Sequence, residues 1–251
     1  MIIYSDGCSL MSGNEHNSWA MNTDTGYEEC DSVWSAIIRN KYFPDAQLYS
    51  RATTGSSNFG IARRTLHYVC ELLKTYKADE ILVCIMWSSI YRKEYSTDKG
   101  YFTTLPTDNK LSLAEEPSGT LMNHSARKQL LQDYNLLELA DVYYKTLNKQ
   151  KNFIYDSMTQ IEYVNLFLKT HKIKSIQCYG FGEHMIKTED KFINNTLQRL
   201  GNYDIFYIKK LQAQGFYEWA NGSHKLGPGL HPLEGAHEMW ANLLAKKYLT
   251  N

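Results

Sequence analysis

Residues 80–87 read Glu-Ile-Leu-Val-Cys-Ile-Met-Trp, an almost unbroken apolar run. A strand that helices cover on both faces has this composition, because neither face meets water. Shorter apolar runs at 2–5, 46–49, 175–179 and 203–208 predict four more strands. Because helical patterns lie between these runs, the sequence predicts an α/β fold with one doubly wound, five-stranded parallel sheet.

The helical patterns have recognisable ends. Asp31 is a predicted N-cap, and the helix that follows it ends before Pro44. Apolar side chains at helical spacing predict further helices, over residues 58–76, 127–149, 153–172 and 233–248. Between about 92 and 125 the pattern gives way to polar residues with prolines and glycines, which predicts an insertion or lid. With no repeat and no linker, residues 1–251 are expected to form a single domain.

The composition excludes several classes of protein. Twenty-seven basic and 27 acidic residues cancel, so the chain lacks the charge of a general nucleic-acid-binding protein, although Arg63-Arg64 leaves room for a small basic patch. Five cysteines form an odd, widely spaced set without a C-x-x-C pair, which favours a reduced compartment and no structural zinc. The N-terminus lacks the features of a signal peptide, and no run reaches the roughly 18 apolar residues of a membrane helix. We therefore expect a cytoplasmic protein that does not bind membranes.

Ligands of open parallel sheets bind at the carboxyl ends of the strands, so the segments that follow the strands are the first candidates for a site. After the first strand, residues 6–13 combine two glycines with Ser9. This segment fits either an ordinary strand-to-helix turn or an outward-facing nucleophile. After the second strand, Gly55 and Asn58 lie directly before a helix, where backbone N–H groups can bind an oxyanion. An ordinary N-cap at Ser57 or Asn58 is the alternative interpretation.

The segment after the third strand and the segment before the last helix supply further candidates. Residues 87–94 contain Trp87, Ser88, Ser89, Arg92 and Glu94. A solvated ion pair is the other interpretation of Arg92 and Glu94. His231 precedes Pro232, so it is expected on extended backbone directly before the final helix. His237 falls within that helix and is expected to be structural.

In residue type and order these segments resemble the SGNH hydrolase family. The first block of that family reads G-D-S-x-x-x-G, and residues 7–13 (Gly-Cys-Ser-Leu-Met-Ser-Gly) match both glycines and the serine, with Cys8 in place of aspartate. The glycine of the second block falls on Gly55, and the catalytic histidine of the fifth block falls on His231. The blocks span residues 7–237, which is nearly the whole chain. More loosely, the chain resembles uncharacterised SGNH-like proteins of tailed bacteriophages.

The resemblance implies a flavodoxin-like SGNH hydrolase fold and a serine esterase that needs no metal or cofactor. Ser9 would be the nucleophile and His231 the general base. The backbone N–H groups of Ser9 and Gly55, with Asn58, would bind the oxyanion. The substrate would be a small molecule or carbohydrate ester that loses a small O-acyl group. It would contact the candidates that follow the third strand: Trp87, Ser88, Ser89, Arg92 and Glu94.

Two groups of the family pattern are replaced in this chain. The asparagine of the third block gives way to Met-Trp-Ser-Ser at 86–89, and Pro228 stands where the acid that orients the histidine is found. The acid is therefore supplied by another segment or replaced by a backbone carbonyl, or the site works as a Ser–His dyad. These replacements leave two alternatives open. One is a binding or structural module without turnover, and the other is an acyltransferase that uses the same Ser9–His231 pair.

Overall fold

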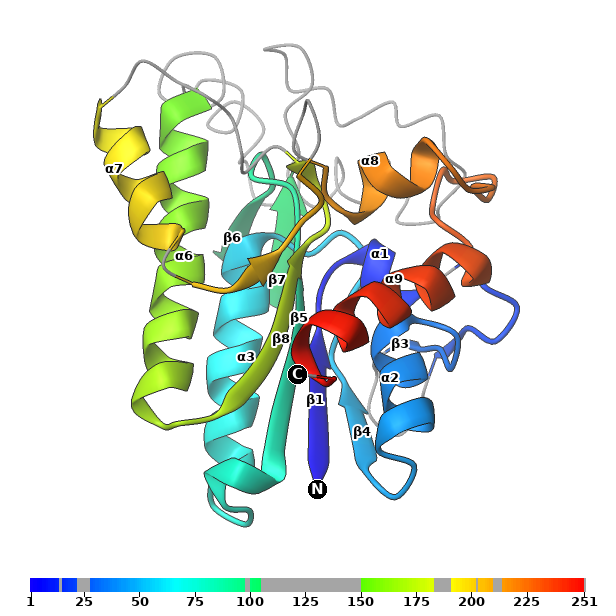
Figure 1. Ribbon diagram of the computed structural model, residues 1–251. Coiled ribbons are helices and arrows are strands. Elements are labelled where there is room, and N and C mark those ends of the chain that lie inside the picture. Colours follow the sequence, from blue (N-terminus) through cyan, green and yellow to red (C-terminus); the bar gives the residue numbers. More distant parts are fainter. Residues whose placement is uncertain are drawn as a thin grey trace.

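The computed structural model describes residues 1–13, 15–21, 28–97, 100–104, 150–182, 191–201, 203–209 and 214–250. Five parallel strands form the central sheet (Figure 1): β1 (Ile2–Asp6), β4 (Gln47–Ser50), β5 (Ile81–Trp87), β8 (Lys174–Tyr179) and β9 (Ile205–Phe206). Their order across the sheet is β4-β1-β5-β8-β9. If these five strands are numbered 1 to 5 along the chain, their order across the sheet is 2-1-3-4-5, the flavodoxin-like arrangement. The prediction of one five-stranded parallel sheet in an α/β fold is confirmed.

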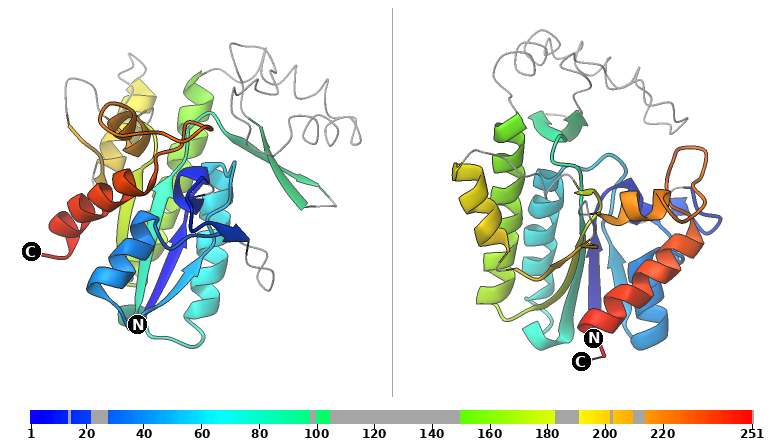
Figure 2. Two further views of the ribbon diagram at one scale, coloured as in Figure 1. Left: turned by 90° about the vertical axis from the view of Figure 1, so that its right-hand side faces the viewer. Right: turned by 45° about the horizontal axis from the view of Figure 1, so that its top comes forward.

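Helices cover both faces of the sheet, as Figures 1 and 2 show. One face carries α3 (Asn58–Leu72), α6 (Gln150–Thr170) and α7 (Lys191–Leu200), and the other carries α2 (Trp34–Tyr42) and α9 (Glu234–Tyr248). Side chains of a strand point alternately to the two faces. In β1, Ile3 therefore joins the core under α2 and α9, and Tyr4 joins the core under α3 and α6. Among the described residues, no helix has the length and apolarity to cross a bilayer.

The smaller elements surround this sheet. They are α1 (Ser9–Ser12), α8 (Phe216–Asn221), the 3₁₀ helix Ala78–Glu80 and two antiparallel hairpins, β2 (Ala20–Met21) with β3 (Glu28–Glu29) and β6 (Lys93–Thr97) with β7 (Gly100–Thr104). The expected insertion near 92–125 thus begins with a hairpin, which stands out from the sheet in Figure 2. Threonine, tyrosine and phenylalanine favour strands, which explains this hairpin in a polar segment. The rest of the expected insertion and the helix expected over 127–149 lie outside the described residues.

The carboxyl ends of the five strands lie together at one edge of the sheet, at the top of Figure 1. The β6–β7 hairpin follows β5 at this edge, and α1 follows β1. Since parallel sheets bind ligands at this edge, the fold brings the segments after β1, β4 and β5 into one region.

Candidate active site

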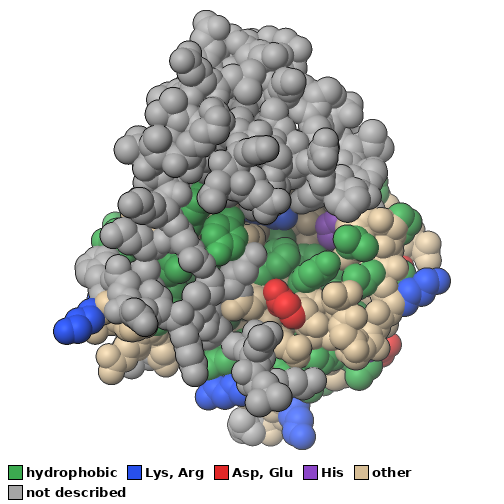
Figure 3. Space-filling model, turned by 90° about the horizontal axis from the view of Figure 1, so that it is seen from above, with side chains coloured by type: hydrophobic (Ala, Val, Ile, Leu, Met, Phe, Trp, Pro, Cys, Tyr) green, Lys and Arg blue, Asp and Glu red, His purple; other side chains and the backbone are tan. Residues whose placement is uncertain are grey.

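Ser9 is the first residue of α1 and follows the end of β1 by three residues. The turn between them requires a glycine at position 7, because a Cβ there would lie 2.6 Å from Met11 Cβ and 3.1 Å from the Met86 carbonyl oxygen. Ser9 is 5% exposed, and as the first helical residue its N–H has no partner within the helix. Seen from above, the described part of this face shows mainly uncharged side chains, with most Lys and Arg at the rim (Figure 3). Ser9 therefore brings a hydroxyl and a backbone N–H to a mainly uncharged edge.

The segment after β4 lies against the segment that carries Ser9. The Thr53 N–H donates to the Gly7 carbonyl oxygen over 3.1 Å, and the hydroxyls of Thr54 and Ser12 are 3.4 Å apart. Gly55 has a φ of 82°, in the left-handed region that favours glycine. The structure thus places Gly55 in a tight turn beside the helix that Ser9 begins.

A buried ion pair fixes the end of β1. Arg64 donates from Nη2 to Asp6 Oδ1 over 2.7 Å and from Nε to Asp6 Oδ2 over 3.1 Å. Asp6 also accepts hydrogen bonds from the Gly7 N–H (2.7 Å) and the Tyr4 hydroxyl (2.8 Å). Burial alone would lower the pKa of Arg64, but the Asp6 carboxylate raises it above its usual value. Arg64 is therefore charged and anchors the turn that leads to Ser9.

Two arginines connect the segments that follow β1, β4 and β5. Arg64 Nη2 donates to the Ser56 hydroxyl over 2.9 Å, in addition to its bonds with Asp6. Arg92 Nη1 lies 3.3 Å from the Ser56 carbonyl oxygen and 3.1 Å from the Ser88 hydroxyl. The strand-end segments that the sequence singled out therefore form one connected network.

Asn58 belongs to this network as a structural clamp. Its side-chain amide donates to the Ser88 carbonyl oxygen (3.0 Å) and to the Ser157 hydroxyl (2.5 Å), and its Oδ1 accepts from the Ser88 N–H (2.6 Å). The side chain is buried. Both amide hydrogens are thus engaged in holding α3 to the end of β5 and to α6, so the Asn58 side chain has no hydrogen left to donate to an oxyanion.

The other candidates after β5 have different surroundings. Trp87 is fully buried and its indole N–H donates to Gln177 Oε1 over 2.9 Å, so its side chain belongs to the core and not to a substrate contact. The Ser89 hydroxyl accepts from the Tyr91 N–H over 3.2 Å. Arg92 and Glu94 line a cavity of about 270 Å³ together with Asn58. Neither Ser9 nor His231 lines that cavity.

Arg63 and Arg64 do not form the small basic patch that their sequence allowed. Arg63 Nε lies 3.1 Å from Glu94 Oε1, and the Glu94 side chain is only 4% exposed. The carboxylate fits there because residue 60 is glycine. A Cβ at that position would lie 2.3 Å from Glu94 Oε2. Since Arg64 pairs with Asp6, both positive charges are neutralised.

His231 is presented by a tight loop before α9. The loop is closed by a hydrogen bond from the Gly227 N–H to the His231 carbonyl oxygen (2.9 Å) and by a bridge between Leu226 and Pro232. Leu230 has a φ of 62°, which is uncommon for a residue other than glycine. Such strained conformations concentrate at functional sites. The loop therefore holds His231 in one position.

A carboxylate from another segment reaches His231. Glu15 follows α1 by three residues, and its Oε1 lies 3.2 Å from His231 Nδ1, at ion-pair distance but without the alignment of a hydrogen bond. Glu15 Oε2 accepts from the His231 N–H over 3.3 Å. A Cβ on Gly229 would lie 1.8 Å from Oε1, and one on Gly227 2.2 Å from Oε2. The two glycines thus leave the space that the carboxylate occupies.

The neighbouring histidines hold the same two segments together. His16 Nε2 lies 3.0 Å from the Pro232 carbonyl oxygen, and its ring contacts that of His237 edge-on, with centroids 4.6 Å apart. His237 is fully buried and its Nδ1 accepts from the Trp34 N–H over 3.2 Å. Burial and the nearby His16 lower the pKa of His237 well below its usual value. His237 is therefore neutral and structural, as its position in the sequence indicates.

Cys30 lies next to His16 and is predicted to be a reactive thiol. Its Sγ is 3.2 Å from the Ser18 hydroxyl and 3.3 Å from the Ser32 hydroxyl, and it lines a cavity of about 240 Å³. Burial raises the pKa of this thiol, but hydrogen bonds with His16, Ser18 and Ser32 lower it to about 7. Because the thiolate is the nucleophile, alkylation of Cys30 by iodoacetamide should accelerate as the pH rises through about 7 and then level off.

Mass spectrometry of the alkylated peptide at each pH measures this rate. In His16→Ala the midpoint should move to higher pH, because one of the hydrogen bonds that stabilise the thiolate is lost. A rate that still rises steeply above pH 8 in the unaltered protein would contradict the prediction.

Sequence reasoning missed Glu15 and the partnership of Asp6 with Arg64. Glu15 lies in a polar stretch after Gly13 that has no motif of its own, and its partner is 216 positions away. Asp6 did carry a signal, because a carboxylate that ends a buried strand needs a charged partner. Arg64 is half of an exposed-looking Arg-Arg pair, so its role could be found only from the three-dimensional contact.

Comparison with known proteins gives a family and a set of similar folds. The model of a family of unknown function, DUF6071, matches residues 20–250. A search of curated proteins found no match. Among solved structures, a member of the lipolytic protein G-D-S-L family from Veillonella parvula DSM 2008 is 11% identical, with a TM-score of 0.45 over 100% of this chain and 99% of that chain.

Two esterases give similar values. The psychrotrophic esterase EstA from Pseudoalteromonas sp. is 12% identical, with a TM-score of 0.48 over 100% of this chain and 99% of that chain. A catalytic mutant of the acetylxylan esterase Axe2 from Geobacillus stearothermophilus is 10% identical, with a TM-score of 0.42 over 100% of this chain and 94% of that chain. These values are too low to transfer residue roles, so we assign roles from this chain alone.

Proposed function

Since the chain belongs to DUF6071, a family of unknown function, we propose its activity from the site itself: it is an SGNH-type serine esterase with Ser9, His231 and Glu15 as a triad. The observation that carries the proposal is the Glu15 carboxylate, which lies 3.2 Å from His231 Nδ1. The chain has Pro228 where the SGNH pattern has its acid, and a carboxylate from the segment after α1 takes that place. A carboxylate at ion-pair distance from one ring nitrogen stabilises the imidazolium that forms when the other nitrogen takes a proton.

In the proposed reaction, Ser9 Oγ attacks the ester carbonyl carbon while His231 Nε2 takes the hydroxyl proton. The resulting imidazolium forms an ion pair with Glu15, which suits the distance between the two side chains. The N–H groups of Ser9 and Gly55 donate to the oxyanion. His231 returns the proton to the leaving alcohol, and water then releases the acyl group from Ser9. No step needs a metal or cofactor.

The proposed substrate is a polar molecule, such as a carbohydrate, that carries a small O-acyl group. Polar side chains support this choice, since Ser88, Ser89 and Arg92 follow β5 at the same edge of the sheet as Ser9. Ser9 is nearly buried, which favours a small acyl group over a long chain. Where it is described, the face seen from above is mainly uncharged, which suits a neutral ester (Figure 3).

Hydrolysis of p-nitrophenyl acetate by Glu15→Gln tests this assignment. We expect kcat/KM to fall by roughly a hundredfold to ten-thousandfold, because glutamine keeps the shape but cannot stabilise the imidazolium. Gly229→Ala should cause a similar loss, since its Cβ would lie 1.8 Å from Glu15 Oε1 and would move that carboxylate. The carboxylate is the end of a flexible side chain, so the fold should tolerate the change.

Gly235→Ala is the matched control, because a Cβ at this position in α9 meets nothing within 4 Å. It should leave kcat/KM within about twofold of the unaltered protein and should not lower its thermal stability. Full activity in both Glu15→Gln and Gly229→Ala would exclude Glu15 from the reaction. A protein without activity above the uncatalysed rate would instead be a binding module of the same fold.

A further inference from the structure

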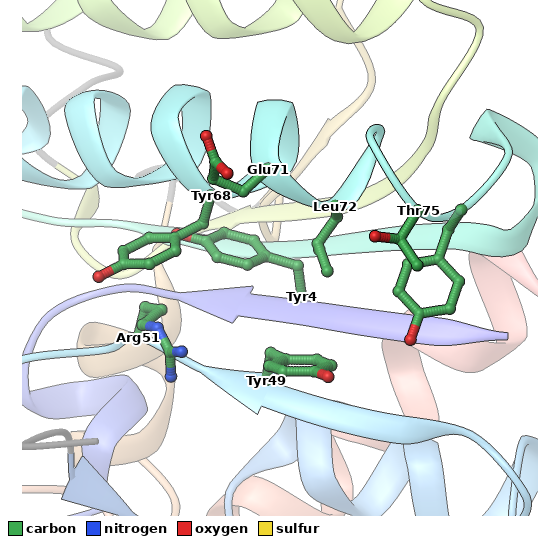
Figure 4. A pocket seen from close by; sticks show the side chains of 8 residues that line it. Tyr4, Tyr49, Arg51, Tyr68, Glu71, Leu72 and Thr75 are labelled. Carbon is green, nitrogen blue, oxygen red and sulfur yellow. The ribbon is translucent and has the colours of Figure 1, made fainter. Parts of the chain in front are cut away.

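A third cavity, of about 270 Å³, lies between α3 and the edge strand β4 (Figure 4). Because β4 has a neighbour on one side only, the space between this strand and the helix is open at the flank of the sheet. Its lining is dominated by aromatic and charged side chains: Tyr4, Tyr49, Tyr68, Tyr76, Arg51 and Glu71. None of the proposed catalytic residues lines it.

The strands supply two tyrosines to one wall. Tyr4 of β1 and Tyr49 of β4 are direct partners in the parallel register, so their side chains lie next to each other on the same face of the sheet. The Tyr4 ring is also stacked with the Tyr68 ring of α3, with centroids 6.4 Å apart. In Figure 4 the Tyr4 ring, which comes from the sheet, and the Tyr68 ring, which comes from α3, lie next to each other between the helix and the sheet.

The helix supplies the opposite wall. Tyr68, Glu71, Leu72 and Thr75 are spaced i, i+3, i+4 and i+7, so they share one face of α3 and the turn that continues it. A helix face that packs on a sheet is normally apolar. Here only Leu72 is aliphatic, and the other three bring hydroxyl and carboxylate groups to the cavity.

The cavity is lined by one positive side chain, Arg51, and one negative side chain, Glu71. The Arg51 guanidinium carbon lies 4.7 Å from the centroid of the Tyr68 ring, and Glu71 pairs with Lys74 at the rim over 2.7 Å. Arg51 already covers that ring, so a cationic ligand would be repelled. Burial and the neighbouring Tyr76 raise the pKa of Tyr49, so its hydroxyl stays neutral and can both donate and accept hydrogen bonds.

We propose that this cavity binds one pyranose ring of a neutral sugar. The C–H faces of a pyranose pack on aromatic rings, and its hydroxyls match the donors and acceptors of tyrosine, arginine and glutamate. The volume is near the lower end of ligand pockets, which fits a single ring. An acyl chain has no hydrogen-bonding groups to offer to this polar lining. The inference does not depend on catalysis by Ser9.

Saturation-transfer NMR with methyl β-D-glucopyranoside tests the proposal on the full chain. We expect saturable binding with a Kd on the order of 1 mM. Tyr49→Ala should weaken it roughly 3- to 10-fold through loss of a stacking surface. Tyr68→Ala should weaken it by a similar factor, because it removes the ring that stacks with Tyr4 and lies under the Arg51 guanidinium. Tyr49→Phe should retain most of the affinity, because it keeps the ring. Tyr163→Ala is the matched control, since this tyrosine of α6 is 63% exposed and lies outside the cavity.

Ser9→Ala should bind the glycoside as the unaltered protein does, which separates this inference from the esterase proposal. Circular dichroism confirms that each variant is folded. The proposal is overturned if binding does not saturate, or if folded Tyr49→Ala and Tyr68→Ala bind as tightly as Tyr163→Ala. Tighter binding of tetramethylammonium than of the glycoside would also overturn it, because the cavity would then be a cation site.

Discussion

Ser9→Ala and His231→Ala should each lower the kcat/KM for p-nitrophenyl acetate by roughly a thousandfold or more. The first change removes the attacking oxygen, and the second removes the base that takes its proton. Without either group the backbone N–H donors can stabilise only the intermediate formed by direct attack of water, which leaves a small residual rate. The starting activity is expected to be weak, since the family's asparagine donor is replaced and Asn58 is engaged with Ser88 and Ser157.

The double variant should be hardly worse than either single one, because nucleophile and base act as a unit. Ser223→Ala and His171→Ala are suitable controls, since both residues are exposed. They should hydrolyse the ester at the unaltered rate. Equal rates in the unaltered protein, the two single variants and the controls would mean that groups other than Ser9 and His231 cause the hydrolysis.

Asp6→Asn should lower the free energy of unfolding by roughly 3–5 kcal/mol. The substitution keeps the size of the side chain but leaves Arg64 as a buried charge without its carboxylate. It also weakens two further hydrogen bonds, from Tyr4 and from the Gly7 N–H, and the latter holds the turn before Ser9. Urea denaturation followed by circular dichroism measures the change.

The exposed ion pair between Arg39 and Asp31 provides the comparison. The Asp31 side chain is 80% exposed, so Asp31→Ala should alter the free energy of unfolding by no more than about 0.5 kcal/mol. If Asp6→Asn were as mild as Asp31→Ala, the Asp6–Arg64 pair could not be what anchors the Ser9 turn.

A strand could be predicted from the sequence where it consists of an unbroken run of apolar residues. β5 is buried on both faces and was evident from residues 81–87 alone. The hairpin of β6 and β7 was missed because its strands are polar and lie outside the sheet. The apolar spacing predicted a helix over residues 58–76, but α3 ends at Leu72. Periodicity shows which face is buried, but it does not fix where the hydrogen-bonded helix stops.

The candidate site was predictable in part, for a similar reason. Ser9, Gly55 and His231 stand next to strand ends and glycines, which local sequence displays. Glu15 has no such marker, because its role depends on a loop that folds back over it and on the space left at Gly227 and Gly229. Trp87 was misjudged because a residue at the end of a strand can point into the core.

Labelling with a fluorophosphonate probe, followed by peptide mass spectrometry, tests the proposed triad most directly. The probe reacts covalently with a serine only when that serine is activated by a base. We expect one adduct, on Ser9, absent in Ser9→Ala and formed much more slowly in His231→Ala, with Ser223→Ala unchanged. No adduct in the folded protein, or an adduct on another serine with Ser9 unmodified, would contradict the assignment of Ser9 as the nucleophile.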